Sequence, residues 1–456
     1  MPNHKVIQFI SQIEEKMKKF NRRKNSIWLA LACLLILSPL LPQSGRKYAR
    51  LFEFIKNTLF IDVHSHPIAG HIEYQIKDPY PTLEPPIDRP FWPVKKERIA
   101  VFDSLQVGAL QEIYRYQKED VTEKDLLGLS ELSQKFWTAG KKKGFNRILD
   151  ICGIEKVFSN SAFPKKDLDP GRVFWVPFVD FLLYPFEGSG MKAISPELQS
   201  SLDYSSKNVW ELSEKYNLKI EEFASYLSFI DKVLDDFHND KAVALKVASG
   251  YIRTLWFEEQ DRDEVALVFE EGLKGNLNSW KRYKKLQDFV ARYIFRKAGA
   301  LKLPVHFHTG FGAIAGLKNL DSNPLNLESV FSDIRFKETQ FLILHGGYPS
   351  WDTLKPILEK RNAYVEFSAI NWFTFEHELA KILHGWLCYP GASEKIMFGS
   401  DGGAPVFFWI AAQNSREALY RALSKLIGRG IIDEEKAVLI AEKIMRKNAA
   451  RLHQID

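Results

Sequence analysis

Cysteine is scarce in this sequence: only Cys33, Cys152 and Cys388 occur among 456 residues, and no two of them have a CxxC spacing. This pattern excludes a cysteine zinc knuckle and a disulfide framework as the basis of the fold. If Cys33 is removed with a leader, Cys152 and Cys388 remain as one pair that could bond. We expect both instead to be small buried apolar side chains.

Positive charge is also sparse outside the N-terminus. The net charge of the chain is +6, but residues 1–50 contain ten Lys or Arg and two Glu, which leaves the remainder at −2. A nucleic-acid-binding domain normally carries a basic stripe on its folded surface. We therefore expect no nucleic-acid partner.

No apolar run reaches the roughly 20 residues that a membrane-spanning helix needs. Residues 27–41 are apolar except for Ser38 and Pro39, and they follow a basic cluster over 18–24. A basic segment followed by a short apolar run is typical of a signal peptide. The cluster and run thus predict that residues 1–46 form a basic N-terminus with a signal peptide, or an uncleaved signal anchor that attaches the chain to a membrane through 27–41.

A signal peptide predicts export to the periplasm or the exterior. An uncleaved signal anchor predicts attachment to the membrane. A buried N-terminal helix is the third alternative. We also hypothesise that Met17 is the true start, because a chain beginning there has a compact basic region before the apolar run.

The composition is ordinary for a soluble globular domain, with 45% hydrophobic and 26% charged residues. Short apolar segments rich in Val, Ile, Leu and Phe alternate with charged, helix-like stretches such as 258–274, 279–298 and 415–426, which predicts α/β units with a parallel sheet. The eight expected strands are 58–64, 154–160, 173–179, 242–248, 303–308, 340–345, 363–368 and 395–400. Eight such units predict a closed (β/α)8 TIM barrel over residues 47–456, which we expect as a monomer or a homo-oligomer.

Two long helical insertions are expected in this barrel. About 90 residues separate the first two strands, including a Pro-rich stretch over 78–93, and residues 185–240 precede the fourth strand. Loops of this length at the catalytic end of a barrel usually cover or shape the site.

Histidine and aspartate residues stand at the ends of four expected strands. The first strand ends in IDVHSHP, and because alternate strand residues share a face, His64 and His66 can meet one ion. The fifth strand ends at His308, the sixth at His345 and the eighth is followed by Asp401. A single histidine in such a place is more often structural than a ligand, but four strands that end in this way form a specific pattern.

This pattern resembles the amidohydrolase superfamily, in particular its amidohydrolase-related branch, which includes the hydrolase-like domain fused to glutamine-synthetase-like proteins. The resemblance covers about residues 47–456. It lies in IDVHSHP, RVFWVPFVD with the following LLYP, LPVHFHTGFG, Asn323–Pro324, LILHGGYPSW and MFGSDGG. It implies His64, His66, His308 and His345 as metal ligands, and Asp401 as a ligand and general base.

Lys246 in the fourth expected strand leaves three alternatives open. The segment VALKVAS is similar to that of phosphotriesterase-type members, in which a carboxylated lysine bridges two metal ions. Lys246 could otherwise bind a substrate carboxylate or stand at a strand edge without a role. Arg253, part of a Tyr-Arg pair similar to one in the resembling branch, is a second candidate for an anionic substrate group.

The ligand set predicts the chemistry. Imidazoles and a carboxylate suit Zn2+, with Fe, Mn or Ni as alternatives, as one ion or two. Such an ion activates a water, and Asp401 takes its proton, with His345 as a further catalytic residue. Tyr348, Trp372 and Trp92 are candidate pocket walls, although packing beneath the loops would explain each as well.

We therefore predict a metal-dependent hydrolase that cleaves an amide, lactone or other C–N or C–O bond of a small molecule. The alternatives are a nonhydrolytic decarboxylase, a phosphotriesterase-like binuclear hydrolase and a metal-stabilised binding protein without activity. Long loops determine specificity, so the sequence does not identify the substrate.

Overall fold

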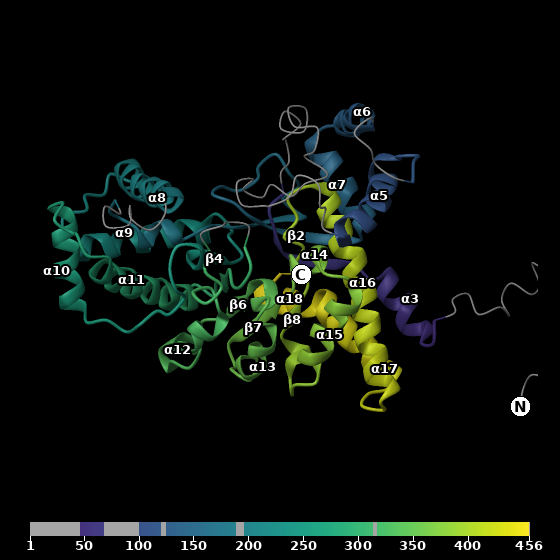
Figure 1. Ribbon diagram of the computed structural model, residues 1–456. Helices are drawn as coiled ribbons and strands as arrows, with labels where there is room; N and C mark the ends of the chain where they lie inside the picture. Colours follow the sequence, from purple (N-terminus) through teal and green to yellow (C-terminus); the bar gives the residue numbers. More distant parts are fainter. Residues whose placement is uncertain (1–45, 68–99, 120–124, 188–195, 313–316, 456) are drawn as a thin grey trace, which may run out of the picture. The chain divides into compact units, whose positions relative to one another are not determined.

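The computed structural model describes residues 46–67, 100–119, 125–187, 196–312 and 317–455 (Figure 1). The chain divides into two units, Met1–Ala49 and Arg50–Asp456. The expected leader, including 27–41 and Met17, lies outside the described residues, as does Trp92. Within the described residues, no helix has the length and apolar character needed to cross a membrane.

Eight short strands form the centre of the second unit, one in each segment expected from the sequence. They are β1 (Phe60–Ser65), β2 (Ile154–Asn160), β3 (Val173–Val176), β4 (Leu245–Val247), β5 (Val305–Phe307), β6 (Phe341–Ile343), β7 (Ala363–Glu366) and β8 (Ile396–Met397). They pair in parallel in the orders β1-β2-β3 and β4-β5-β6-β7-β8. The expected α/β class with parallel strands is confirmed.

Bridges between these two sheets close the ring. Trp175 in β3 pairs in parallel with Ala242, and Phe178 after β3 pairs with Lys246 in β4, which joins β3 to β4. At the other seam Ser65 pairs with Gly402, and the Val63 amide donates to the carbonyl of Phe398 at 3.1 Å. Since each strand thereby contacts the next in sequence order, and the last contacts the first, the sheet closes into a TIM barrel.

Helices alternate with the strands. Those that precede β4 are α3 (Ala49–Asn57), α5 (Ala100–Tyr114), α6 (Leu126–Trp137), α7 (Lys141–Cys152), α8 (Pro196–Lys215) and α9 (Phe223–Asn239). Those that follow are α10 (Arg262–Leu273), α11 (Trp280–Ala300), α12 (Glu328–Phe331), α13 (Leu354–Ile357), α14 (Ile370–Phe373), α15 (Glu376–Leu387), α16 (Pro405–Gly428), α17 (Glu434–Glu442) and α18 (Asn448–His453). Helices α5–α7 thus lie between β1 and β2 in sequence, and α8 and α9 lie between β3 and β4.

The longer helices begin and end where their sequences dictate. Asp261 accepts hydrogen bonds from the amides of Asp263 and Glu264 and so caps α10. Helix α11 buries Leu286, Val290 and Ile294 at the four-residue spacing of one helix face. Figure 1 shows α9, α10 and α11 together beside the strands. There the ring of Phe269 packs on that of Tyr226 with centroids 5.0 Å apart.

The C-terminal helix α18 contributes to the core of the barrel. Ala449 and Leu452 pack with buried residues from the strands, including Val63, Phe158 and Met397. His453 lies edge-on to Phe158, and its Nε2 is 2.8 Å from Nε2 of His306 in β5. His306, two residues before His308, therefore contacts the helix that fills this part of the barrel.

The cysteine expectations are met in part. Cys152 and Cys388 are both free, so the alternative that they pair is wrong. Cys152 is buried at the end of α7, as expected, and burial raises the pKa of its thiol. The prediction of a buried Cys388 is wrong, because the residue directly follows the last turn of α15 and is exposed.

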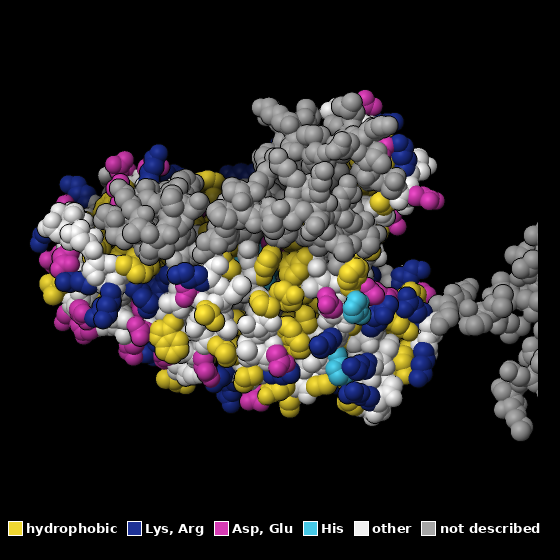
Figure 2. Space-filling view, in the orientation of Figure 1, with side chains coloured by type: hydrophobic (Ala, Val, Ile, Leu, Met, Phe, Trp, Pro, Cys, Tyr) yellow, Lys and Arg dark blue, Asp and Glu magenta, His cyan; other side chains and the backbone are white. Residues whose placement is uncertain are grey.

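Charges of both signs lie on the surface of the described residues. On the face shown in Figure 2, acidic and basic side chains of the described residues are interspersed, with hydrophobic side chains between them. Many of the charges pair locally, as Lys285 does with Glu264 and Arg421 with Glu417.

Candidate metal centre

The carboxyl ends of the strands carry the predicted ligands. His64 belongs to β1, and His66 follows that strand directly. His308 comes one residue after β5, His345 two residues after β6 and Asp401 four residues after β8. Because the strands are parallel, these ends lie at one end of the barrel, where barrel enzymes carry their sites.

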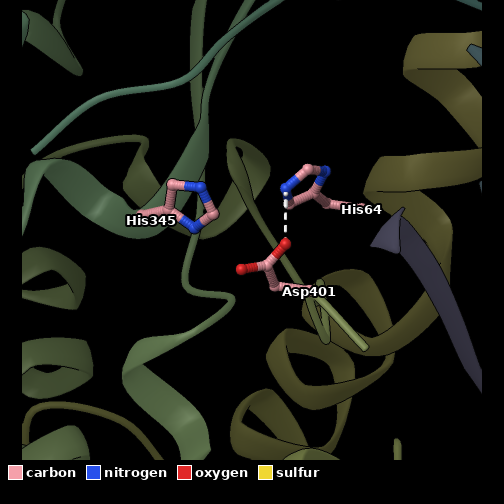
Figure 3. A group of neighbouring side chains, drawn as sticks. All are labelled: His64, His345 and Asp401. Atoms are coloured by element: carbon pink, nitrogen blue, oxygen red, sulfur yellow. Dashed lines mark ion pairs between the residues drawn. The ribbon is translucent and has the colours of Figure 1, made fainter. Parts of the chain in front are cut away.

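Asp401 joins both histidines of the first strand. Its Oδ1 lies 3.1 Å from Nε2 of His64 and 3.3 Å from Nε2 of His66. One ring atom of His64, one of His345 and one oxygen of Asp401 all lie within 4.8 Å of one another, a spacing that one metal ion can bridge. Figure 3 shows these three side chains converging from separate segments.

His308 and Lys246 extend this cluster on two sides. Nδ1 of His308 lies 3.0 Å from Nε2 of His345, and the ring of Tyr251 stacks on His308 with centroids 4.1 Å apart. Nζ of Lys246 lies 3.4 Å from Nε2 of His64. The structure thus places all six predicted ligands in one continuous group.

Burial sets the charge state of these groups. Desolvation, together with the positive charge of Lys246, lowers the pKa of His64 well below its ordinary value, and burial and His345 do the same for His308. Burial lowers the pKa of His345 to about 4. These three imidazoles are therefore neutral at pH 7, the form that donates a lone pair to a metal ion.

Asp401 and Lys246 supply the charges of the cluster. Burial alone would raise the pKa of Asp401, but attraction to His64 and hydrogen bonds from His64 and His66 hold it well below its ordinary value. Burial lowers the pKa of Lys246 to about 8. No carboxylate of the described residues lies within 4.0 Å of the Lys246 ammonium, so its charge has no direct counterion among them.

This donor set fits a divalent metal ion. It combines neutral imidazoles with an ionised carboxylate, the mixture that Zn2+ and similar ions prefer. Nε2 of His308 is buried and has no hydrogen-bond partner among the described residues. A buried nitrogen without a partner is costly, and coordination would satisfy it.

Two of the ligands have an unusual backbone. His345 and Asp401 have φ of 60° and 54°, in the left-handed region that side chains rarely adopt. Such strain concentrates at functional sites and costs about 1–3 kcal/mol per residue. Gly310, beside His308, allows close approach of the neighbouring loop, since a Cβ there would lie 2.2 Å from the carbonyl oxygen of Tyr348.

The residues that hold these ligands were not predicted from the sequence. The amide of Asn160, at the end of β2, lies 2.9 Å from Nδ1 of His64. The carboxylate of Asp62 accepts from the amides of His64 at 3.2 Å and Ser400 at 2.8 Å. The i, i+2 spacing of Asp62 and His64 in β1 is a signal that could have identified this contact.

A second buried carboxylate, that of Glu366, contacts His345 after the sixth strand. Glu366, in β7, accepts from the amide of His345 at 2.7 Å, and the hydroxyl of Ser368 lies 2.9 Å from Nδ1 of His345. Burial raises the pKa of Asp62 to about 8 and that of Glu366 to about 7, while the hydrogen bonds each accepts act in the opposite direction.

Arg253 is placed differently from the sequence expectation. Its guanidinium is buried and donates to Asp288 at 2.5 Å, to Gln287 at 3.2 Å and to two backbone carbonyls. These contacts neutralise the charge and use four donor groups. We therefore do not retain Arg253 as a residue that binds an anionic substrate.

Of the aromatic candidates, Tyr348 lies on the loop that follows β6, and Trp372 lies in α14, which follows β7. Tyr348 is half-buried, and its ring meets that of Phe373 with centroids 5.1 Å apart. Trp372 is buried against Phe407 at 5.0 Å, and its Nε1 has no partner among the described residues. Both side chains belong to one aromatic group, as packing beneath the loops requires.

Comparison with known protein families gives a match in the C-terminal half of the chain. The family model described as amidohydrolase matches residues 252–455, which hold His308, His345 and Asp401. Residues 252–455 are therefore similar to the amidohydrolase family, in a match that covers less than half of the chain. The resemblance predicted from the sequence is thereby confirmed.

Among curated proteins, the chain is similar to protein fluG of Emericella nidulans, with 26% identity over 181 residues. The match covers 38% of this chain and only 20% of the fluG protein. The chain thus corresponds to about a fifth of the length of that relative.

Solved structures match over nearly the whole chain. They include a protein described as a metal-dependent hydrolase from Lactobacillus casei (TM-score 0.63, 16% identity, 89% of this chain and 97% of that one). Uronate isomerase from Thermotoga maritima gives a TM-score of 0.66 at 14% identity, with 90% of this chain and 98% of that one covered. Glucuronate isomerase from Caulobacter crescentus gives 0.64 at 11%, with 91% and 96% covered. At these identities the matches show a shared fold.

Proposed function

We propose that this protein is a metal-dependent hydrolase that cleaves an amide, lactone or other C–N or C–O bond of a small molecule. The observation that carries the proposal is the group of His64, His345 and Asp401, from three strands, with one ligand atom each within 4.8 Å. The similarity of residues 252–455 to the amidohydrolase family supports an enzyme of this type.

The proposed centre holds one ion with His64, His66, His345 and Asp401, and with His308 as a further ligand. When bound, a divalent ion lowers the pKa of a water molecule toward about 7 and polarises the scissile carbonyl. Asp401 is ionised and accepts hydrogen bonds from two imidazoles, so it can accept the proton of the attacking water and return it to the leaving group.

Lys246 favours a second candidate, a binuclear hydrolase of the phosphotriesterase type. Its Nζ lies 3.4 Å from Nε2 of His64 and has no carboxylate of the described residues within 4.0 Å. A buried ammonium without a counterion is unfavourable. Either a bridging carbamate or the carboxylate of a substrate would relieve this cost.

The first experiment distinguishes hydrolysis from the other reactions of related proteins. The Zn2+-reconstituted protein is incubated in H2(18)O with a panel of lactones, esters and amides, beside a His64→Ala variant. Hydrolysis predicts an acid product that carries one 18O atom, formed by the wild type only. An isomerised product or released carbon dioxide would replace the hydrolase by a nonhydrolytic enzyme, and no turnover by a metal-loaded protein would favour a binding role.

The cellular setting remains a proposal that rests on the sequence. We propose export or membrane attachment through residues 27–41, which precede the described unit. Fractionation of cells that make the native protein, with N-terminal sequencing of the product, tests cleavage and the Met17 start together. Sedimentation of the purified chain tests whether it forms a homo-oligomer.

A further inference from the structure

The side chain of Ser368 contacts two groups that matter for His345. Its Oγ lies 2.7 Å from Oε1 of Glu366 and 2.9 Å from Nδ1 of His345. All three residues are buried, with exposed fractions of 0% for Glu366 and Ser368 and 3% for His345. Water therefore does not compete for these contacts.

The direction in which Ser368 donates its single hydroxyl proton determines which ring nitrogen of His345 carries a proton. Both oxygens of Glu366 accept hydrogen bonds from backbone amides, which favours a carboxylate that only accepts, so the proton of Ser368 goes to Glu366. Oγ must then accept the Nδ1–H of His345. Nε2 is left with its lone pair, and this nitrogen is the one that contacts Nδ1 of His308 at 3.0 Å.

Glu366 also holds the backbone of His345. Oε1 accepts from the His345 amide at 2.7 Å, and Oε2 accepts from the amide of Ser368. His345 has the left-handed conformation noted above, which persists only where its surroundings enforce it. Gly399 leaves room for this arrangement, since a Cβ there would lie 2.3 Å from Oε2 of Glu366.

We propose that Glu366 and Ser368 form a carboxylate–hydroxyl–imidazole relay that positions His345, fixing both its tautomer and its backbone for metal binding. The inference rests on the proposed function, because it assumes that His345 is a ligand. Partners that orient a ligating histidine in this way typically change metal affinity by about 10–100-fold when removed.

The test measures Zn2+ affinity of the full chain by competition with a chromophoric chelator, and the visible absorption of the Co2+-substituted protein. The variants are Ser368→Ala, Glu366→Gln and the two combined. Ser206→Ala is the matched control, since Ser206 is also buried and donates to a backbone carbonyl, that of Pro185, at 3.1 Å.

Ser368→Ala should weaken Zn2+ binding by about 10–100-fold and alter the Co2+ spectrum, whereas Ser206→Ala should change neither. Glu366→Gln should act in the same direction, because an amide nitrogen would face the Ser368 amide. The double variant should lose less than the product of the single losses, since both residues act through one ring. If Ser368→Ala is too unstable to purify, Glu366→Gln carries the same test.

The two proposals fail in different ways. If the wild type binds no metal, the proposed function fails and this inference fails with it. If the wild type binds Zn2+ and both single variants bind within about twofold of it with an unchanged Co2+ spectrum, the relay is wrong and the metal-dependent function stands.

Discussion

Nε2 of His64 and Oδ1 of Asp401 lie 3.1 Å apart, although the residues belong to the first strand of the barrel and to the loop after the last. The contact exists only because the ring of strands closes between β8 and β1. Closure therefore assembles the centre, and a chain whose barrel did not close would separate its two principal ligands.

Replacing the carboxylate should abolish the function of this centre without unfolding the protein. Asp401→Asn keeps the shape of the side chain but removes the charge and the proton acceptor. Loss of a general base typically lowers kcat by about 100- to 10,000-fold. Rates on the substrate found in the 18O assay measure the effect, beside the exposed Asp150→Asn as a control. Activity within tenfold of the wild type would exclude Asp401 as the base.

The buried pair of Arg253 and Asp288 predicts a structural role for the arginine. Their side chains are 1% and 0% exposed, and removal of one member leaves a buried charge without a partner. We expect Arg253→Ala to lower the free energy of unfolding by about 3–5 kcal/mol. Arg421→Ala, which removes partly exposed ion pairs with Glu417 and Glu376, should cost less than about 1 kcal/mol. Urea denaturation compares the two. A stable Arg253→Ala protein with only a raised KM would restore the substrate-binding interpretation.

The buried ammonium of Lys246 is expected to lower the stability of the fold and to be needed for turnover. Burial of an ammonium without a counterion is unfavourable, so an apolar side chain of similar length should be preferred by the fold. We expect Lys246→Met to raise the free energy of unfolding of the metal-free protein by about 1–3 kcal/mol and to reduce turnover. Thermal unfolding with chelator present measures the first effect. A destabilised variant would show that the lysine has a structural partner.

His453 predicts a loss of stability in acid. Burial lowers its pKa from 6.5 to about 4, so the unfolded chain binds a proton between these values that the folded chain does not. The free energy of unfolding therefore falls as the pH drops from 7 through this range. Between pH 7 and pH 5 this group alone should cost about 2 kcal/mol.

His453→Gln tests that contribution. The variant should lose stability less steeply than the wild type between pH 7 and pH 5, as followed by urea denaturation at each pH. Equal slopes for the two proteins would show that His453 already carries its proton in the folded state.

The sequence predicted much of this architecture because buried parallel strands are continuous apolar runs. Each expected segment contains one strand, although most strands are shorter than expected. The predicted strand ends are wrong because regular pairing between strands stops where the backbone turns toward the candidate metal centre. His345 shows this, since it lies in a left-handed turn after β6 and not within the strand.

The ligands were predictable and the residues that support them were not. A histidine at a strand end is visible as a pattern, whereas Glu366 and Ser368 matter only because β7 pairs with β6. The position of Arg253 could not be predicted for the same reason, since its partner Asp288 lies on α11 and no local pattern links them. Both cases depend on contacts between segments that are distant in sequence.

Metal content measured by elemental mass spectrometry tests the central claim most directly. The chain is purified without chelator, beside His64→Ala and His308→Ala variants. The account predicts one divalent ion per chain, lost in His64→Ala and weakened in His308→Ala, while two ions would assign Lys246 to a bridging carbamate. No bound metal in the wild type, even after reconstitution with Zn2+, would contradict the account and leave these histidines as structural residues of the barrel.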